Sequence, residues 1–340
     1  MKYNFCTLFD KNYLYRGLAL YNSLLKHCPD FKLWILCMDD IAYNLLNKMN
    51  LYNVELISLK EFENQELLKI KNTRTAVEYC WTCTSSLLYY LLKKYSDLKM
   101  LAYLDSDMYF YSSPQPIYDE MGDKSIMIIP HKLSPANKQL ETTSGKYNVG
   151  MLIFKNNKDG INCLGWWKDK CIDWCYNYYD KGRYGDQLYL NDWPEKFSGV
   201  CVLKHKGTDI APWNVSQYKV KKINNQILID NEPLIFYHFH SLKIYSNLKF
   251  RLFGASYKIS PKTKKIIYRP YVKELKEIII NIRTIDSLFN YGFSPQPSLL
   301  TRTLSNNKPI KLHAIFKKVP LYHKLYKYVK TLIYDKKNKS

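Results

Sequence analysis

The feature of this sequence that most restricts its fold is an alternation of short apolar runs with amphipathic stretches over the first sixty residues. Residues 3–8, 31–37 and 54–57 are mostly apolar and typical of buried strands. Between them, residues 13–26 and 41–49 repeat apolar side chains at helical spacing. Strands that alternate with helices pair into a mostly parallel sheet covered on both faces, so the sequence predicts an α/β fold.

The alternation continues to about residue 240. A long helical pattern over residues 75–95 leads into the apolar run 100–104, which ends on Asp105-Ser106-Asp107. Open α/β sheets bind ligands at the carboxyl ends of their strands, so this is where a site is expected. The remaining expected elements are strands at 125–130, 149–154 and 234–239 and an aromatic-rich helix at 166–179.

Charge divides the chain into two regions. The 340 residues carry a formal net charge of +21, and the last hundred, with 22 basic and 4 acidic side chains, account for +18 of it. We therefore expect a near-neutral body over residues 1–243 and a basic, largely helical C-terminal extension over 244–340. Within that extension, residues 310–334 have the pattern of a helix on an anionic membrane surface, although an ordinary packing helix would share it.

Cysteine usage indicates a reducing compartment. The nine cysteines show no disulfide-framework spacing and the N-terminus lacks an extended apolar signal segment, which favours the cytoplasm. Cys80 and Cys83 have redox-motif spacing, and Cys171 and Cys175 lie one helical turn apart. We interpret all four as buried free thiols, because no second pair at zinc spacing accompanies them. No apolar run approaches the roughly 18 residues that a spanning helix requires.

The Asp105-Ser106-Asp107 segment is the strongest candidate for chemistry. Two carboxylates around one residue, directly after a buried strand, are hard oxygen ligands that hold a divalent cation and leave positions open for a diphosphate. The alternative interpretation is a polar turn at the end of the strand. An Asp-x-Asp pair also occurs in phosphohydrolases, where the first carboxylate is the nucleophile, but Tyr109 stands where such a site normally has Thr or Val.

Several motifs, taken in order, resemble those of glycosyltransferase family 8, the retaining galactosyl- and glucosyltransferases with a GT-A fold that include bacterial lipopolysaccharide enzymes. The similarity runs from residue 3 to about 243. It implies a Rossmann-like, mostly parallel sheet flanked by helices. The motifs are Asp10-Lys11-Asn12-Tyr13, Asp105-Ser106-Asp107, Tyr147-Asn148-Val149-Gly150-Met151, Gly185-Asp186-Gln187 and Tyr237-His238-Phe239-His240-Ser241-Leu242-Lys243.

The first motif resembles the family's loop that holds the donor nucleotide. A carboxylate such as Asp10 accepts from a uracil N–H, the Asn12 amide reaches a ribose, and the Tyr13 ring stacks on a base. The resemblance places Leu8 beside them at the end of the first strand. The alternative interpretation of Asp10 is an N-cap of the following helix.

The resemblance also implies a metal site with Mn²⁺ or Mg²⁺ bridging the donor diphosphate. Asp105 and Asp107 match the family's metal-binding carboxylates, with Ser106 between them at the donor. A histidine from a late strand completes the family's site; His238 is the better match by spacing, and His240 lies on the same strand face. In this sequence Ser241 replaces the motif glycine and the lysine comes one residue early. Lys243 is nonetheless expected to reach a phosphate.

The remaining matches concern the sugars. Asn148 and Gly150 resemble a segment beside the donor sugar. Asp186 resembles the family's ligand of sugar hydroxyls, and Gln187 the residue near the reacting carbon, although Asp186 would equally cap a helix that begins near 187. Trp213 and Asn214 occupy the position of a loop at the acceptor cleft, where burial of Trp213 is the simpler explanation.

Arg74 is matched to a basic residue that contacts the diphosphate or the donor sugar in this family. It lies one helical turn before Glu78. A surface ion pair between these two side chains would explain both equally well.

Together these matches predict a metal-dependent glycosyltransferase. Its expected donor is a nucleotide-diphosphate sugar with uridine as the nucleoside, its expected acceptor is a glycan or a lipid-linked sugar, and the anomeric configuration is expected to be retained. The expected setting is lipopolysaccharide or other surface-glycan synthesis in the cytoplasm, at the inner face of the membrane. The rival interpretations are the phosphohydrolase above and a non-enzymatic nucleic-acid-binding protein. The second lacks a recognised motif, and charge confined to one end fits poorly with a groove that follows phosphates, so no nucleic-acid partner is expected.

Overall fold

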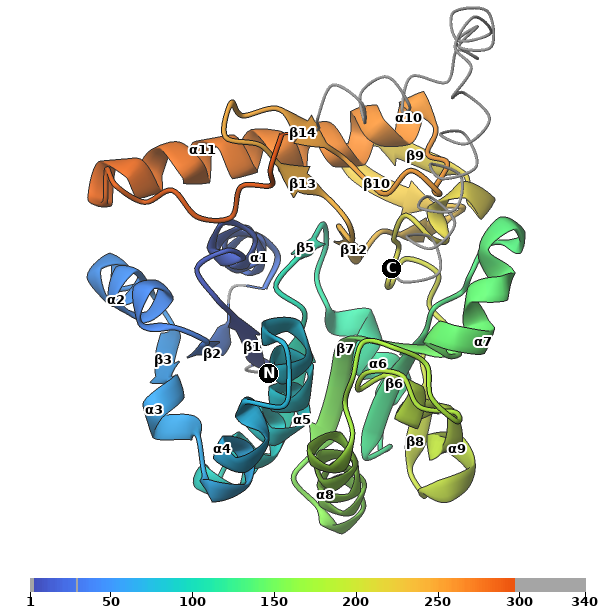
Figure 1. The fold of residues 1–340 in the computed structure, drawn as a ribbon. Helices are drawn as coiled ribbons and strands as arrows, with labels where there is room; N and C mark the ends of the chain where they lie inside the picture. Colours follow the sequence, from blue (N-terminus) through green and yellow to red (C-terminus); the bar gives the residue numbers. More distant parts are fainter. Residues whose placement is uncertain (1–2, 29, 297–340) are drawn as a thin grey trace, which may run out of the picture. The chain divides into compact units, whose positions relative to one another are not determined.

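The computed structural model describes residues 3–28 and 30–296. Its centre is a seven-stranded sheet in the order β3-β2-β1-β4-β7-β6-β8 (Figure 1). Strands β1 to β4 are parallel, β7 is antiparallel to its neighbours β4 and β6, and β8 is parallel to β6, which confirms the predicted α/β class. These strands are β1 (Tyr3–Phe9), β2 (Phe31–Cys37), β3 (Val54–Ser58), β4 (Met100–Leu104), β6 (Ile126–Pro130), β7 (Tyr147–Lys155) and β8 (Val200–Val202).

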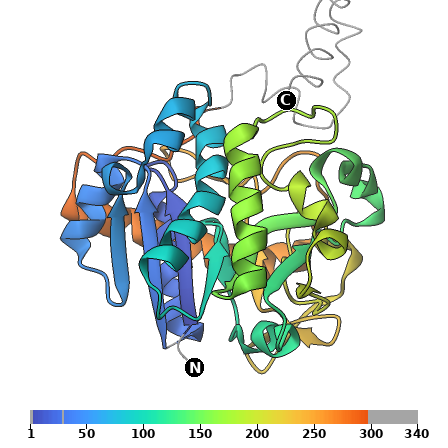
Figure 2. The ribbon, with the colours of Figure 1, turned by 90° about the horizontal axis from the view of Figure 1, so that it is seen from below.

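Helices cover both faces of this sheet. Figure 2 shows α5 and α8 side by side on one face, where their apolar side chains form one core cluster. Helices α1 and α11 pack together in the cluster of the other face. The helices are α1 (Leu14–His27), α2 (Asp40–Met49), α3 (Leu59–Phe62), α4 (Gln65–Lys71), α5 (Ala76–Lys94), α6 (Gln115–Met121), α7 (Glu141–Ser144), α8 (Lys158–Asp173), α9 (Trp193–Lys196), α10 (Pro261–Thr263) and α11 (Arg269–Ile285).

The two-faced sheet explains why the strands are apolar at nearly every position. In β1, Phe5 belongs to the core cluster of one face and Cys6 to that of the other, and both are fully buried. Successive side chains of a strand point to opposite faces, so a sheet covered on both sides needs apolar residues at both parities. Helix α5 begins at a capping box, in which Thr75 and Glu78 satisfy each other's backbone N–H groups.

Smaller sheets connect the body to the C-terminal part of the described chain. Strand β5 (Met108–Phe110), which follows the Asp105–Asp107 turn, pairs antiparallel with β12 (Phe236–His238) and places His238 opposite Met108. This pairing brings a late strand to the carboxyl end of β4. The other strands are β9 (Val220–Ile223), β10 (Gln226–Ile229), β11 (Glu232–Pro233), β13 (Lys243–Ile244) and β14 (Phe250–Arg251), and the short helices are η1 (Pro135–Leu140), η2 (Leu188–Asp192), η3 (Val215–Gln217) and η4 (Lys264–Tyr268).

The helix expected at 166–179 is wrong in its bounds. Helix α8 begins eight residues earlier, where the Asn157 side chain accepts from the Gly160 N–H, and it ends at Asp173. The aromatic residues that follow pack on one another instead, with Trp174 and Tyr176 in edge-to-face contact. Spacing alone could not reveal this end of the helix, because tertiary contacts hold the segment that leaves it.

The body extends beyond its expected boundary after residue 243. One compact unit runs from Met1 to Ser294, and α11 packs on α1 within it. The helix expected at 310–334 lies outside the described residues. Among residues 3–28 and 30–296, no helix is both long enough and apolar enough to cross a membrane. All nine cysteines are free, and Cys83, Cys171 and Cys175 are buried as expected, whereas Cys80 is only half-buried.

Candidate active site

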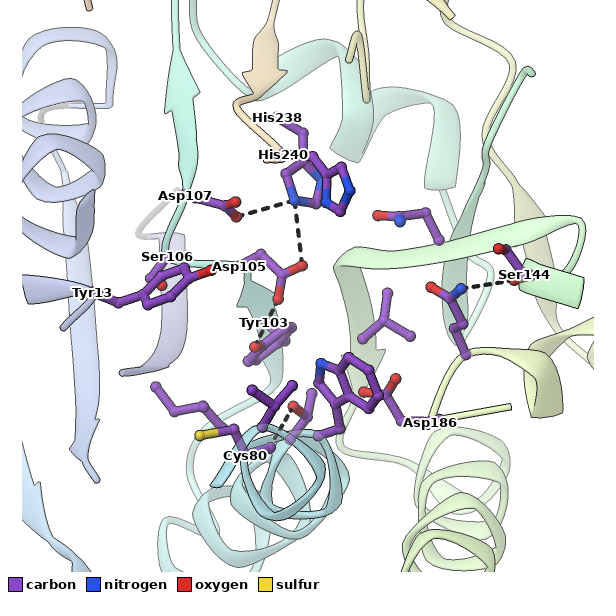
Figure 3. Close-up of a pocket in the computed structure, with 18 of the residues that line it drawn as sticks. Tyr13, Cys80, Tyr103, Asp105, Ser106, Asp107, Ser144, Asp186, His238 and His240 are labelled. Carbon is purple, nitrogen blue, oxygen red and sulfur yellow. Dashed lines mark hydrogen bonds and ion pairs between the residues drawn. The ribbon is translucent and has the colours of Figure 1, made fainter. Parts of the chain in front are cut away.

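The carboxyl end of β4 carries three converging side chains. The Asp105 N–H donates to the Gly150 carbonyl of β7 (2.8 Å), and the chain turns through Asp107 into β5. His238 Nε2 lies 3.0 Å from Asp107 Oδ1 and 3.7 Å from Asp105 Oδ2 (Figure 3). The structure therefore brings together the two carboxylates and the better of the two expected histidines.

The arrangement of these three residues fits a divalent cation. One ligand atom from each of Asp105, Asp107 and His238 lies within 4.8 Å of the others, and carboxylate oxygens with an imidazole nitrogen suit Mn²⁺ or Mg²⁺. A hydrogen bond from the Tyr103 hydroxyl to Asp105 Oδ1 (2.9 Å) fixes the orientation of this carboxylate. His240 lines the same cavity but is not part of this three-residue group.

Charge in this cluster is concentrated and buried. Burial alone would lower the pKa of His238, but Asp107, Asp209 and Asp105 outweigh it and raise that pKa well above its ordinary value. Burial raises the pKa of Asp105 despite the attraction of His238. For Asp107 the attraction and hydrogen bond of His238 overcome burial, so its pKa is lowered.

A cavity of about 430 Å³ opens beside this cluster. Figure 3 places Tyr13 and Asp186 on opposite sides of it, with Asp105 between them. Among the described residues, neither lysine nor arginine lines the cavity, although the chain as a whole is strongly basic. The expected site residues in its lining are Leu8, Asp10, Tyr13, Asp105, Ser106, Asp107, Asn148, Asp186, Gln187, Trp213, His238 and His240.

The loop after β1 forms one end of the cavity. Asp10 Oδ1 accepts from the backbone N–H groups of Asn12 (2.9 Å) and Tyr13 (3.1 Å), which fixes a tight turn. Asp10 therefore caps the turn that leads into α1, whereas the N-cap residue of the helix itself is Tyr13. Asn12 lies outside the cavity lining, and its side-chain amide donates to Asp10 (2.7 Å). Tyr13 is 45% exposed, and the Arg16 guanidinium lies 4.5 Å from the centroid of its ring.

The opposite end of the cavity carries amide and carboxyl groups. Asp186 is 5% exposed, and burial together with the charge of Asp105 raises its pKa well above the ordinary value. Gln187 Nε2 donates to the Ser144 carbonyl (2.8 Å). Helix η2 begins at Leu188 with Gln187 as its N-cap residue and has no side-chain cap, so the capping interpretation of Asp186 is wrong.

Two expected site residues, Arg74 and Lys243, lie elsewhere in this structure. Arg74 stacks on the Tyr176 ring, 3.9 Å from its centroid, and donates to the Ile172 carbonyl at the end of α8. Its expected ion pair with Glu78 is replaced by the capping box of α5. Lys243 is exposed on β13 and lies outside the cavity lining.

Gly150 and Asn214 support the site from behind the cavity lining. The Gly150 N–H donates to Asn148 Oδ1 (2.6 Å), and a Cβ at residue 150 would lie 3.0 Å from His238 Nδ1. Asn214 is fully buried and donates to the carbonyls of His131 (2.9 Å) and Asp209 (2.8 Å). Gly150 and Asn214 therefore help to hold His238 in its position.

Other lining residues were not expected from the sequence. Trp81 and Tyr184 form an aromatic pair beside Gly185, with ring centroids 6.2 Å apart. His131 and Tyr257 line the side nearest His240. One feature of the sequence could have pointed to Trp81. It lies in the first turns of α5, just after the capping box, and this end of the helix lies near the carboxyl ends of the strands, where a site is expected. No pattern in the sequence pointed to His131.

Comparisons with known proteins place this geometry in a family. Residues 4–194 match the model of glycosyl transferase family 8. The uncharacterized proteins YfnD and YfnF of Bacillus subtilis (strain 168) are 35% and 33% identical over 297 residues. These alignments span 86% and 85% of this chain and 95% and 97% of theirs.

A solved structure shares the fold. That of the galactosyltransferase LgtC, in complex with donor and acceptor sugar analogs, superposes with a TM-score of 0.50 at 15% identity, over 81% of this chain and 95% of that one. At this identity the likeness shows the fold alone, which is GT-A as expected. The family match identifies the activity class and replaces the phosphohydrolase and nucleic-acid interpretations. The chain belongs to glycosyl transferase family 8 and is a glycosyltransferase of GT-A fold.

Proposed function

We propose that this glycosyltransferase moves a hexose from a uridine diphosphate sugar to a hydroxyl of a glycan or lipid-linked acceptor. The reaction requires Mn²⁺ or Mg²⁺ bound beside the donor. The observation that carries the proposal is the convergence of Asp105, Asp107 and His238 beside the cavity. Carboxylates alone repel a diphosphate. With a cation between them, the same groups attract it.

The carboxyl-rich lining of the cavity supports this reasoning. Asp10, Asp105, Asp107 and Asp186 all line it, and no lysine or arginine does so in the part of the chain that the structure describes. A bound divalent cation supplies Lewis acidity at the departing diphosphate. Asp105, Asp107 and His238 would hold it, and the Tyr103 hydroxyl fixes the orientation of the Asp105 carboxylate.

Two ends of the cavity suit the two parts of the donor. We place the uracil and ribose at the β1 loop, where Tyr13 offers a ring face and Leu8 an apolar contact, and Asp10 holds the turn. The hexose then lies towards Asp186 and Gln187. A carboxyl and an amide supply the paired donors and acceptors that sugar hydroxyls require. Trp81 and Tyr184 add the aromatic surface on which a sugar ring can rest.

We propose retention of the anomeric configuration. The acceptor hydroxyl would attack on the face from which the diphosphate departs and pass its proton to the leaving phosphate. Asp186 and Gln187 would orient the sugar and stabilise the positive charge that develops at its anomeric carbon. Proton NMR of fresh product should show the anomer of the donor, whereas the opposite anomer would exclude this route.

The acceptor is proposed from the sequence of the C-terminal hundred residues. Their 22 basic side chains against 4 acidic ones suit an anionic membrane surface, such as the inner face of a cell membrane where surface polysaccharide or lipopolysaccharide is assembled. Trp213, whose ring contacts those of His238 and His240, is proposed at the acceptor side of the cavity.

The test is hydrolysis of a panel of uridine, guanosine and cytidine diphosphate sugars by the purified protein, with Mn²⁺ and then with a chelator. We expect release of one nucleotide diphosphate that requires the metal and is lost in Asp105→Asn. Asp97→Asn is the matched control, because Asp97 is exposed and lies outside the cavity lining. Equal turnover in the presence of chelator, or turnover that survives in Asp105→Asn, would refute the metal-dependent mechanism.

A further inference from the structure

The second ring nitrogen of His238 faces a buried carboxylate. His238 Nε2 points at Asp107 and Asp105, while Nδ1, on the other side of the ring, lies 3.5 Å from Asp209 Oδ1. Asp209 is 1% exposed and His238 4% exposed. Asp209 is not one of the three residues that converge on the candidate cation site, and no motif in the sequence pointed to it.

Nothing else in the described chain satisfies this carboxylate. Both Asp209 oxygens and His238 Nδ1 are buried atoms without a hydrogen bond in the structure. A buried charge without a partner is costly, so the geometry calls for a donor within reach. The ammonium of Lys132 is committed to the His205 carbonyl and to Thr208. His238 Nδ1 is therefore the donor that the arrangement supplies.

The loop that carries Asp209 is tied to the strand that carries His238. The His238 N–H donates to the Ile210 carbonyl (2.8 Å), and Ile210 forms a bridge with Tyr237. Asn214 donates to the Asp209 carbonyl (2.8 Å) and accepts from the Ala211 N–H (2.9 Å). Asp209 itself has a φ of +49°, a left-handed conformation that costs energy and persists only where surrounding contacts hold it.

We propose that Asp209 is a positioning residue for His238. Its carboxylate accepts the Nδ1–H of the imidazole and so keeps the Nε2 lone pair directed at the space between Asp105 and Asp107. A histidine ligand whose other nitrogen donates to a carboxylate is held in one tautomer and one orientation, and becomes a better donor to a metal. Asp209 acts through His238 and does not touch the substrate. The inference rests on the proposed cation site.

Direct titration of Mn²⁺, followed by the electron paramagnetic resonance of the free ion, tests this without donor, acceptor or turnover. Asp209→Leu removes the acceptor but keeps the branching and the number of heavy atoms of the side chain, and we expect it to weaken Mn²⁺ binding by about 10–100-fold. Asp209→Asn keeps an uncharged acceptor, so we expect a loss near the lower end of that range. Both variants leave the buried Nδ1–H of His238 without its carboxylate partner, so we expect them to unfold at lower urea than the wild type.

Thr208→Val is the matched control on the same loop. Thr208 is fully buried, and its hydroxyl bonds to Lys132 and to the His205 carbonyl, so its loss should lower stability while leaving the Mn²⁺ affinity unchanged. A second measurement uses ¹⁵N-histidine NMR of the Mg²⁺-loaded wild type. We expect the His238 signal to show a protonated Nδ1 and an unprotonated Nε2.

The outcomes separate this inference from the proposed function. Wild-type protein that fails to bind Mn²⁺ would overturn the cation site and the positioning role together. Wild-type binding with unchanged affinity in both Asp209 variants would overturn the positioning role alone. An Nε2-protonated His238 in the Mg²⁺-loaded protein would do the same, whatever the variants show.

Discussion

Gly150→Ala should damage both the fold and the cation site, because the residue lies directly behind His238. A Cβ at this position would fall 2.4 Å from Asn148 Oδ1 and 3.0 Å from His238 Nδ1, where ordinary contact begins at 3.4 Å. Asn148 and His238 are only 7% and 4% exposed, so neither side chain has free space to enter. Displacing Asn148 also lengthens its 2.6 Å bond from the Gly150 N–H.

The expected magnitude follows from these two effects. Overpacking of a buried site costs about 1–3 kcal/mol, and the weakened hydrogen bond about 1 kcal/mol more. We therefore expect the free energy of unfolding, measured by urea denaturation, to fall by about 2–4 kcal/mol. The Mn²⁺ affinity should fall as well, since the methyl group pushes the imidazole away from its position between Asp107 and Asp209.

Gly165→Ala is the matched control for this change. Gly165 lies within α8, and a Cβ there would meet Tyr89 at 3.6 Å, an ordinary contact. Alanine is the better helix former, so this variant should be more stable than the wild type by about 0.5–1 kcal/mol, with unchanged Mn²⁺ affinity. If Gly150→Ala matched the wild type in both stability and Mn²⁺ affinity, the described packing behind His238 would be refuted.

Two further predictions concern buried ionisable groups. Burial raises the pKa of Asp186, so its ionised form destabilises the folded protein above the unfolded pKa of about 4. Asp186→Asn should therefore unfold at higher urea at pH 7, with the gap closing towards pH 4, while donor turnover is lost. Burial also lowers the pKa of Lys132 to about 8 from 10.5, so the unfolded chain binds more protons between these values. Wild-type stability relative to Lys132→Met should rise from pH 8 to 10.5, by up to about 3 kcal/mol in urea titrations, and a flat difference would contradict it.

Local sequence was sufficient to predict six of the seven strands of the central sheet, all but β8, and the two carboxylates after β4. The strands around Asp105 are buried on both faces, and such strands have a continuous apolar pattern that is visible without any partner. The position of Asp105 and Asp107 follows directly from the end of β4. His238 was expected from the resemblance to the family's late histidine motif, and the β5–β12 pairing, which no local pattern revealed, places it beside Asp107.

Residues whose position depends on distant contacts could not be assigned from the sequence. Lys243 lies five residues beyond His238, but its strand pairs with β14 and the side chain is exposed. Arg74 stacks on Tyr176, a residue about a hundred positions away. Asp209 lies in a loop without a motif, and hydrogen bonds made by Asn214 and Ile210 hold this loop beside His238. Contacts of this kind join distant parts of the chain, so they produce no periodic pattern in the sequence.

The most direct test of the account is a calorimetric titration of uridine diphosphate into the protein, with Mn²⁺ present and after chelation. Four carboxyl groups line the described cavity, and no described lysine or arginine does so. We predict binding with Mn²⁺ and its loss in chelator, with the same loss in Asp107→Asn. Binding that is equally tight without metal would contradict the central claim that Asp105, Asp107 and His238 hold the cation on which the donor depends.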